Sequence, residues 1–373
     1  MASIINVGIN GMGVLGRRLL RMLFSETSGF STPFEVKGIN DPMPIAALAY
    51  FVKNDTVYGR WEDVSVNYTD NNGNGDILSL VGGGNSWDIL VSHETSISNI
   101  HWDNMYVEQV VDCTGTYNDE ISMLNHLNPG GAKSVICCNE SFQDFGAFVY
   151  GVNISSGLFK SNSGSLIFGC PTKSIAQSIA VEALDHYFSI ECATIQDVIS
   201  YTNLNNLEDS YKIVNGTEYQ MGRAGAWNII PSGITRGTKM IGKILPHLNG
   251  KVFGTECRCG TIAGSISYIN YMSPHAYSVE DYVLFLQNHH YDTYTLDTAL
   301  SYGMPCCGIS KDTAFQVSSD LIGKPFVLFN VNNYCQVDNG TYYLVKSGVT
   351  YDNISVIAGN AILLMQEVNK EFM

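Results

Sequence analysis

Three glycines near the start of the chain have the spacing of a phosphate-binding turn. Gly11, Gly13 and Gly16 follow an apolar stretch at 4–7 and precede a helical pattern at 18–23. In that setting the first glycine permits a tight turn, the second lets backbone approach a pyrophosphate, and the third lets helix and strand pack closely. The helix N-terminus adds unpaired N–H groups and the positive end of its dipole. The pattern predicts a dinucleotide site, with an ordinary strand–turn–helix connection as the alternative.

An acidic residue after the second apolar stretch indicates which dinucleotide this site takes. Asp41 follows the stretch at 34–39, at a spacing a few residues longer than usual. A carboxylate there can accept hydrogen bonds from the ribose hydroxyls, and it repels a 2′-phosphate. The sequence therefore predicts NAD rather than NADP.

A cysteine in the middle of the chain is the candidate nucleophile. Cys170 is followed by Pro171 and then by a helical pattern. Because proline is favoured at the first helical position, we expect Cys170 at or next to the N-cap. The helix dipole would lower the pKa of a thiol there, as a reactive cysteine requires. A buried structural thiol is the alternative reading.

The surrounding elements predict an α/β fold class. Short apolar strands alternate with helical patterns over the first third of the chain, which indicates a Rossmann-type parallel-sheet nucleotide-binding domain. Longer period-2 stretches after Cys170 indicate a second, α+β domain of the catalytic type with a mixed or antiparallel sheet. The expected elements are strands at 106–112, 134–138, 264–271 and 326–331, a hairpin excursion at 70–86, an amphipathic helix after Cys170, and a last helix at 358–372 that packs on the first domain.

Length and charge restrict the class of protein. A chain of 373 residues that is 45% hydrophobic can bury two cores. A net charge of −15 argues against nucleic acid and anionic membrane surfaces as partners. No apolar run reaches the roughly 18 residues that span a bilayer, and the N-terminus lacks the pattern of a signal peptide. We therefore expect a cytoplasmic protein.

The ten cysteines have no regular spacing, which favours reduced thiols over a disulfide framework. Cys257 and Cys259, with the pair at 306–307, could be drawn as a metal set. The chain has no Cys-x-x-Cys pair or suitably spaced histidine to support it. We expect no metal site.

Short segments in a fixed order along nearly the whole chain resemble glyceraldehyde-3-phosphate dehydrogenases. These segments are 8–17, 39–42, 114–115, 130–133, 151–153, 228–231, 242–243, 248–251, 318–320 and 351–353. The resemblance implies an NAD-binding Rossmann domain at 1–169, completed by a C-terminal helix at about 354–373, and a catalytic-like domain at 170–353. It also implies a phosphorylated aldehyde as substrate and a homotetramer. The loop between Asn205 and Arg223, which builds the tetramer centre in the family, is about three residues longer here, so the oligomer stays open.

The NAD contacts implied by the resemblance are well preserved. They fall on Asn10, Gly11, Gly13, Val14, Leu15, Gly16, Asp41, Thr114, Gly115 and Asn353. Asn353 matches the asparagine that meets the nicotinamide amide. Val14 departs from the family's usual arginine, at a position that contributes largely through its backbone.

The reaction site is poorly preserved. Cys170 aligns with the catalytic cysteine, but Ile199 stands at the position of the catalytic histidine. An isoleucine can neither deprotonate a thiol nor donate to an oxyanion. The hydroxyls that hold the attacking phosphate flank the family's cysteine, and here Gly169 and Pro171 replace them.

Contacts to the substrate's own phosphate are retained in part. Thr202 and Arg258 match the threonine and arginine that hold it. Arg236 lies in a turn one residue longer than the family's, where it is either a new anion contact or a solvated loop arginine.

Three functions remain open at this point. The first is an NAD-binding protein deficient in phosphorylating aldehyde oxidation. The second is an active NAD-dependent aldehyde dehydrogenase that uses Cys170 on glyceraldehyde-3-phosphate or another aldehyde. The third is a structural or assembly protein built on this fold. A general base is typically worth about 10²–10⁴-fold, which favours the first reading, and the complete glycine turn argues against the third.

Overall fold

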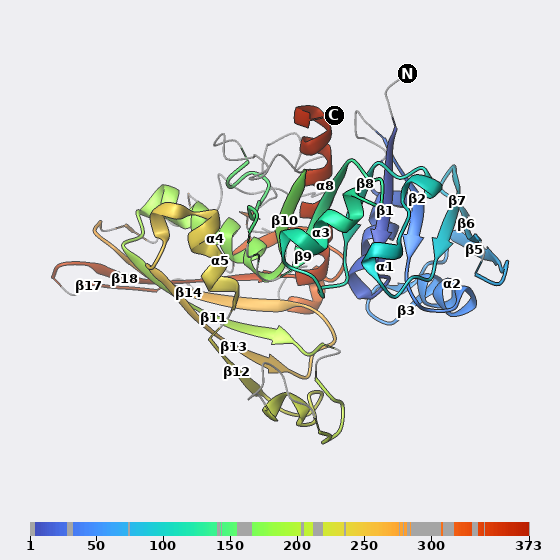
Figure 1. Ribbon diagram of the computed structural model, residues 1–373. Helices are drawn as coiled ribbons and strands as arrows, with labels where there is room; N and C mark the ends of the chain where they lie inside the picture. The colour runs from blue at the N-terminus through green and yellow to red at the C-terminus, as the bar shows by residue number, and fades with distance from the viewer. Residues whose placement is uncertain are drawn as a thin grey trace. The chain divides into compact units, whose positions relative to one another are not determined.

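The computed structural model describes most of the chain. The described residues are 4–27, 33–73, 75–139, 142, 144–154, 166–202, 205–211, 219–234, 236–275, 277–278, 280–281, 284, 307–308, 317–329, 335–338 and 340–372. Contacts divide them into two compact units (Figure 1). The first unit contains 4–172 and 357–372, and the second contains 173–284 and 307–356.

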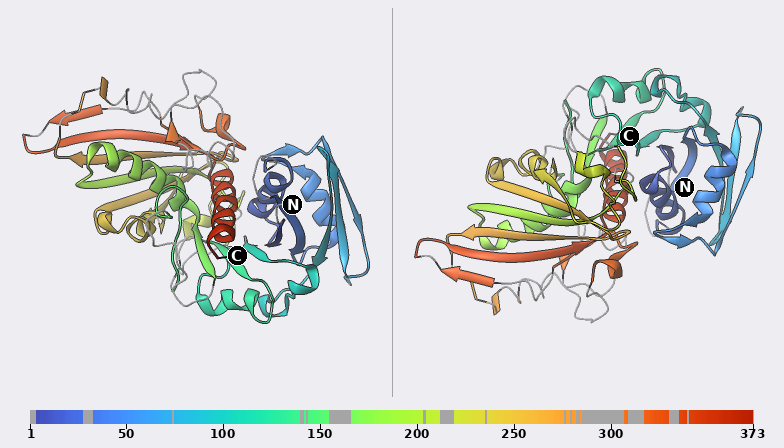
Figure 2. Two further views of the ribbon diagram at one scale, coloured as in Figure 1. Left: turned by 90° about the horizontal axis from the view of Figure 1, so that it is seen from above. Right: turned by 90° about the horizontal axis from the view of Figure 1, so that it is seen from below.

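The first unit is built on an eight-stranded sheet in the order β10-β9-β8-β1-β2-β7-β6-β5. From β10 to β7 neighbouring strands are parallel, whereas β7, β6 and β5 pair antiparallel as the margin drawn in pale blue in Figure 2. The strands are β1 (Ile5–Asn10), β2 (Phe34–Asn40), β5 (Val64–Thr69), β6 (Asp76–Gly82), β7 (Asn85–Ser92), β8 (Gln109–Asp112), β9 (Ser134–Asn139) and β10 (Ile167–Pro171). Because chain order runs from β1 to β2 on one side and from β8 to β10 on the other, the strand order reverses between β1 and β8.

Helices follow the strands of this unit. They are α1 (Val14–Ser25), α2 (Ile45–Lys53), α3 (Glu120–Leu127) and the greater part of α8 (Asn353–Phe372), and a small ladder joins β3 (Asn54–Asp55) to β4 (Gly59–Arg60). The side chain of Asp119 caps α3 by accepting from the Ser122 N–H. Strand β8 begins later than predicted because 103–105 form a 3-10 turn and Tyr106 has a left-handed φ of 59°.

The second unit contains a mixed sheet in the order β12-β13-β11-β14-β18-β16-β15, with β17 paired to β18. Its strands are β11 (Cys192–Ser200), β12 (Ile230–Ile234), β13 (Val252–Cys259), β14 (Ser265–Ser273), β15 (Cys307–Gly308), β16 (Val327–Phe329), β17 (Cys335–Asp338) and β18 (Tyr343–Tyr351). The helices α4 (Thr172–Phe188) and α5 (Arg236–Ile244) accompany it. A parallel-dominated sheet in one unit and a mixed sheet in the other confirm the predicted α/β class.

Helix α4 departs from the amphipathic helix that the sequence predicts, because its polar side chains are buried along with its apolar ones. Lys173, Ser174 and Gln177 are all buried. Buried polar groups are tolerated where they have hydrogen-bond partners, and Lys173 and Gln177 find theirs on β13 and β11. Among the helices of the described residues, none is both long and apolar enough to cross a membrane.

Candidate functional site

The glycine turn, residues 11–16, joins β1 to α1. Gly11 has a φ of +91°, which favours glycine. A Cβ on Gly16 would lie 2.1 Å from the carbonyl oxygen of Gly11, so that only glycine lets helix and turn approach this closely. A Cβ on Gly13 would meet nothing within 4 Å. The first and third glycines therefore serve the fold, and the second leaves open space at the start of the helix.

The start of α1, beside this open space, has the N–H donors that a pyrophosphate needs. Gly13 is the N-cap of α1 and makes no side-chain capping bond. The first intrahelical bond runs from the Arg17 N–H to the Gly13 carbonyl, so the N–H groups of Val14, Leu15 and Gly16 have no intrahelical partner. Helix N-termini of this kind bind phosphate through N–H groups and dipole together.

Asp41 lies directly beside the glycine turn. Its Oδ2 accepts from the Met12 N–H at 2.7 Å, and its Oδ1 accepts from the Met43 N–H at 2.9 Å. An ionised carboxylate has about four lone-pair sites, so it retains capacity to accept ribose hydroxyls. The structure thus brings Asp41 to the position that the sequence predicted for it.

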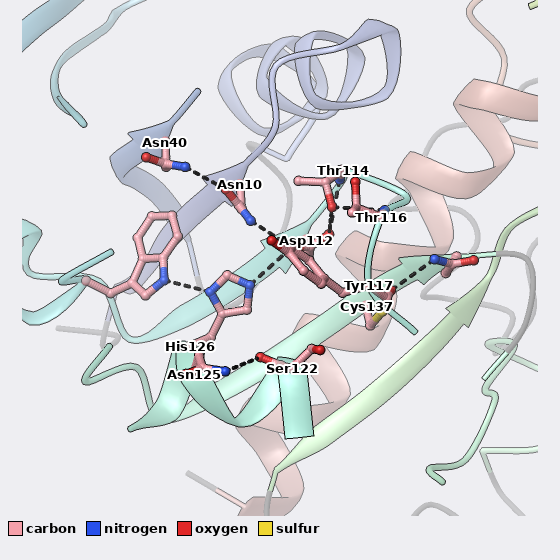
Figure 3. A network of polar contacts seen from close by, with 12 residues as sticks. Asn10, Asn40, Asp112, Thr114, Thr116, Tyr117, Ser122, Asn125, His126 and Cys137 are labelled. Carbon is pink, nitrogen blue, oxygen red and sulfur yellow. Dashed lines mark hydrogen bonds and ion pairs between the residues drawn. The ribbon is translucent and has the colours of Figure 1, made fainter. Parts of the chain in front are cut away.

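A second turn, Thr114–Gly115, follows β8 on the other side of β1. Thr114 donates from its N–H at 3.1 Å and from its hydroxyl at 2.7 Å to Asp112 Oδ1 (Figure 3). Asn10 donates to Asp112 Oδ2 at 2.7 Å. Gly115 has a φ of +64° and open space at its Cβ position. Nine of the ten predicted NAD contacts therefore gather at the carboxyl ends of β1, β2 and β8, where Rossmann sheets bind ligands.

The tenth predicted contact, Asn353, belongs to the second unit and begins α8. Its Oδ1 is buried and, among the described residues, has no hydrogen-bond partner. A buried acceptor without a partner costs about 1–3 kcal/mol, which a ligand amide can recover by donating to it. This observation fits the nicotinamide contact that the resemblance implies.

Cys170 contradicts the predicted low thiol pKa. It lies in β10, next to Pro171, which directly precedes α4, so its place beside the helix N-cap is as predicted, but it is fully buried. Its Sγ lies 3.4 Å from Asn360 Nδ2 and 3.8 Å from the Ile357 carbonyl oxygen, and it is hydrogen-bonded to the Cys138 thiol. Burial, followed by the contact with Cys138, raises the pKa of the Cys170 thiol well above its ordinary value. Desolvation of the thiolate outweighs the helix dipole, so the pKa shift has the opposite sign to the one that the sequence predicts. The role of Cys170 as a nucleophile stays a prediction.

The residue before this cysteine has no room for a side chain. A Cβ on Gly169 would lie 2.6 Å from the Gly146 carbonyl oxygen and 2.6 Å from the ring of Phe142. A serine cannot be accommodated there without a backbone shift. The packing of this unit around Gly169 therefore excludes a hydroxyl-bearing side chain directly before Cys170.

The position of the missing base lies on β11 in the second unit. Ile199 is buried there, and Asp197 is buried two residues before it on the same face of the strand. Asp197 accepts from Gln177 Nε2 and from the Ser267 hydroxyl, both at 2.5 Å. Burial raises the pKa of Asp197 to about 7. We did not predict this group, although an acid at an inward position of a period-2 strand was a visible signal.

The predicted substrate-phosphate contacts are largely engaged with the protein itself. Arg258 is buried, with NH2 3.3 Å from Glu256 Oε1 and NH1 donating to the Ser200 carbonyl at 3.2 Å. Glu256 in turn pairs with Lys173 at 3.1 Å. Only Nε of this guanidinium is buried without a partner among the described residues. Glu256 is thus shared between two cations, and its charge offsets that of Arg258 only in part.

The remaining predicted contacts give less information. Thr202 follows β11, and its N–H donates to Asn205 Oδ1 at 3.1 Å. Arg236 is the first residue of α5 rather than a loop residue, and its side chain lies outside the described residues.

Asp197 makes the stability of the protein depend on pH. The folded state keeps the Asp197 proton up to about pH 7, whereas an unfolded aspartate releases it near 3.8. Between these values the folded state binds more protons, so stability falls as pH rises, by about 1.4 kcal/mol per pH unit and about 4 kcal/mol in all. The charge of Lys173 on α4 lowers the pKa of Asp197 and so weakens the pH dependence. The charge of Glu256 on β13 raises this pKa and so strengthens the dependence.

Asp197→Asn should remove the dependence, since an amide does not titrate. Gln177 Oε1 is buried, has no partner among the described residues, and can accept from the new amide. Urea unfolding of both proteins from pH 4 to pH 8 measures the difference. Wild type should lose stability relative to the variant as pH rises to about 7, and a constant difference would contradict the assignment.

The arrangement defines a class of protein: a chain of two units, of which the first has a Rossmann-type nucleotide-binding fold. Residues 5–120 match the glyceraldehyde 3-phosphate dehydrogenase NAD-binding domain, and residues 169–353 match the C-terminal domain of the same enzymes. The chain belongs to the glyceraldehyde-3-phosphate dehydrogenase family, and NAD is the cofactor of the domain that it carries.

Individual relatives are similar over most of both chains. A glyceraldehyde-3-phosphate dehydrogenase of Lactococcus lactis is 32% identical over 71% of this chain and 72% of its own. One of Mucor circinelloides, glyceraldehyde-3-phosphate dehydrogenase 1, is 34% identical over 69% and 70%. Glyceraldehyde-3-phosphate dehydrogenase 3, cytosolic, of Zea mays is 30% identical over 70% and 72%.

Proposed function

We propose that this chain binds NAD through the glycine turn, Asp41 and Thr114–Gly115, and that it is deficient in phosphorylating aldehyde oxidation. The environment of Cys170 carries the proposal. Within the described residues its sulfur contacts a carbonyl, an amide and a second thiol, none of which accepts a proton from a thiol at neutral pH. With Ile199 at the base position, little thiolate forms.

The second candidate is an active dehydrogenase acting on a phosphorylated aldehyde. Arg258 and Thr202 support a phosphate contact, but the pairing of Arg258 with Glu256 argues against a strong one. The third candidate, a scaffold without a ligand, does not account for two observations. A Cβ at Gly13 would meet open space, and Asn353 Oδ1 is buried without a partner among the described residues.

Calorimetric titration with NAD and a steady-state assay of NADH formation, with glyceraldehyde-3-phosphate and phosphate saturating, separate the three candidates. We expect NAD binding together with turnover far below the common enzyme range of about 1–10³ s⁻¹. Turnover within that range would establish the active dehydrogenase. Absence of NAD binding at millimolar concentration would favour the scaffold.

We also propose a cytoplasmic homo-oligomer, a tetramer if it follows the resemblance. Five large apolar side chains among the described residues of 207–229 are exposed, and their burial in an interface between copies would be favourable. They are Leu207, Tyr211, Tyr219, Trp227 and Ile229. The proposed domains are 1–169 with 354–373, which bind NAD, and 170–353, which correspond to the family's catalytic domain.

A further inference from the structure

A buried polar cluster lies behind the carboxyl ends of β1 and β8, and no NAD contact inferred from the sequence includes its central groups. Trp102, His126 and Asp112 are all fully buried. Trp102 Nε1 lies 2.9 Å from His126 Nδ1. His126 Nε2 lies 3.1 Å from Asp112 Oδ2 (Figure 3). With Asn10 and Thr114, which bond to the same carboxylate, these residues form what we call the Asp112 network.

The direction of both hydrogen bonds of His126 is determined by the tryptophan. An indole N–H can only donate, so His126 Nδ1 must be the acceptor. The imidazole proton is therefore on Nε2, and it points at Asp112 Oδ2. Trp102 thus holds His126 in the one neutral tautomer that can donate to the carboxylate.

Asp112 receives four donors, two on each oxygen. His126 and Asn10 donate to Oδ2 at 3.1 and 2.7 Å. The Thr114 N–H and hydroxyl donate to Oδ1 at 3.1 and 2.7 Å. An ionised carboxylate only accepts, so these contacts use its whole capacity, and they fix the orientation of Asn10 and Thr114.

Asn10 and Thr114, which the carboxylate orients, support the two turns of the NAD site, the glycine turn and Thr114–Gly115. Asn10 ends β1 directly before Gly11, and it pairs in register with Asp112 on β8. A Cβ on Gly11 would lie 3.0 Å from Thr114 Cγ2, so the threonine packs against the glycine turn. The carboxylate therefore sets the separation of the glycine turn from Thr114–Gly115, in the crevice where the strand order reverses.

We infer that Asp112, with His126 and Trp102 behind it, is a positioning group for the dinucleotide, which sets the spacing of the two turns without touching the ligand. The inference rests on the proposed NAD site. It assigns to three buried residues an effect on NAD affinity that is separate from their effect on stability.

Asp112→Asn tests this most directly, because it keeps the shape of the side chain and replaces one acceptor with a donor. The new N–H₂ faces either Thr114 or the donors of His126 and Asn10, so one turn loses its anchor. We expect the Kd for NAD, measured by calorimetry on samples shown to be folded by circular dichroism, to rise about tenfold or more.

A pair of substitutions at His126 separates polarity from packing. Gln carries an acceptor and a donor as close together as the two ring nitrogens, whereas Phe is an apolar ring. His126→Gln should bind NAD within about threefold of wild type, and His126→Phe about tenfold or more weakly. Met123→Val, a buried substitution on the same helix outside the network, is the matched control, and its affinity should be unchanged.

Nuclear magnetic resonance of ¹⁵N-labelled wild type provides a test that needs no variant: His126 should be protonated on Nε2, and the other tautomer would overturn the inference. It would also be overturned if wild type binds NAD and folded Asp112→Asn or His126→Phe binds it equally well. If wild type itself does not bind NAD, the proposed site fails instead, and the two failures are therefore distinguishable.

Discussion

Gly13→Ala and Gly16→Ala should lose NAD binding for different reasons. At Gly16 a Cβ would be 2.1 Å from a backbone oxygen that cannot move independently of the turn. Overpacking of this kind costs about 3 kcal/mol or more, which corresponds to a fall in Tm of roughly 10 °C for this unit. NAD binding should be lost together with the geometry of the turn.

At Gly13 the backbone has a φ of −62° and ψ of −169°, which alanine adopts, and the added Cβ meets nothing in the protein. Stability should therefore stay within about 0.5 kcal/mol of wild type. The methyl group instead occupies space where backbone and pyrophosphate approach each other, so the Kd for NAD should rise at least about tenfold. Differential scanning calorimetry and NAD titration measure the two effects. Wild-type affinity in Gly13→Ala would show that the dinucleotide does not use this turn.

Restoring a histidine alone should leave the protein far from an efficient dehydrogenase. A general base is worth about 10²–10⁴-fold in a complete site, but here Cys170 is buried with a raised pKa and Gly169 admits no hydroxyl. We expect Ile199→His to raise NADH formation by less than about tenfold over wild type, so that turnover stays below about 1 s⁻¹.

The control for this experiment is Cys170→Ala, assayed with the same substrates. If Ile199→His and the double variant Ile199→His with Cys170→Ala have equal residual turnover, the thiol takes no part in NADH formation. Circular dichroism and thermal unfolding report whether each variant is folded, which matters because Ile199 is a buried position. If Ile199→His exceeds 1 s⁻¹ and the double variant does not, the thiol is available and the proposed deficiency is wrong.

The features that the sequence by itself determined are those that short, contiguous segments of the chain carry. The glycine turn was predicted from local spacing, because a strand, a turn and a helix fold from neighbouring residues. Asp41 was predicted from its place after the second apolar stretch, and it meets Met12 across 29 residues because β1 and β2 pair in parallel. The order of segments identified the family, and the replacement of the catalytic histidine by Ile199 follows from alignment with them. These inferences need no knowledge of which distant residues meet.

The tertiary structure alone decided the state of Cys170. Its sequence position predicts a lowered pKa, because the dipole of a following helix is a local effect. The partners that bury it, Ile357 and Asn360, lie 187 and 190 residues further along the chain. Desolvation depends on such distant segments, and it reverses the sign of the shift.

The same reason explains why Asp197 and the Asp112 network were not predicted. Asp112 meets Asn10 across 102 residues and His126 across 14, and Asp197 meets Ser267 across 70. Each contact joins different strands or a strand and a helix. Single polar residues within apolar strands show in the sequence that something must satisfy them, but only the packing of the strands determines which groups do so.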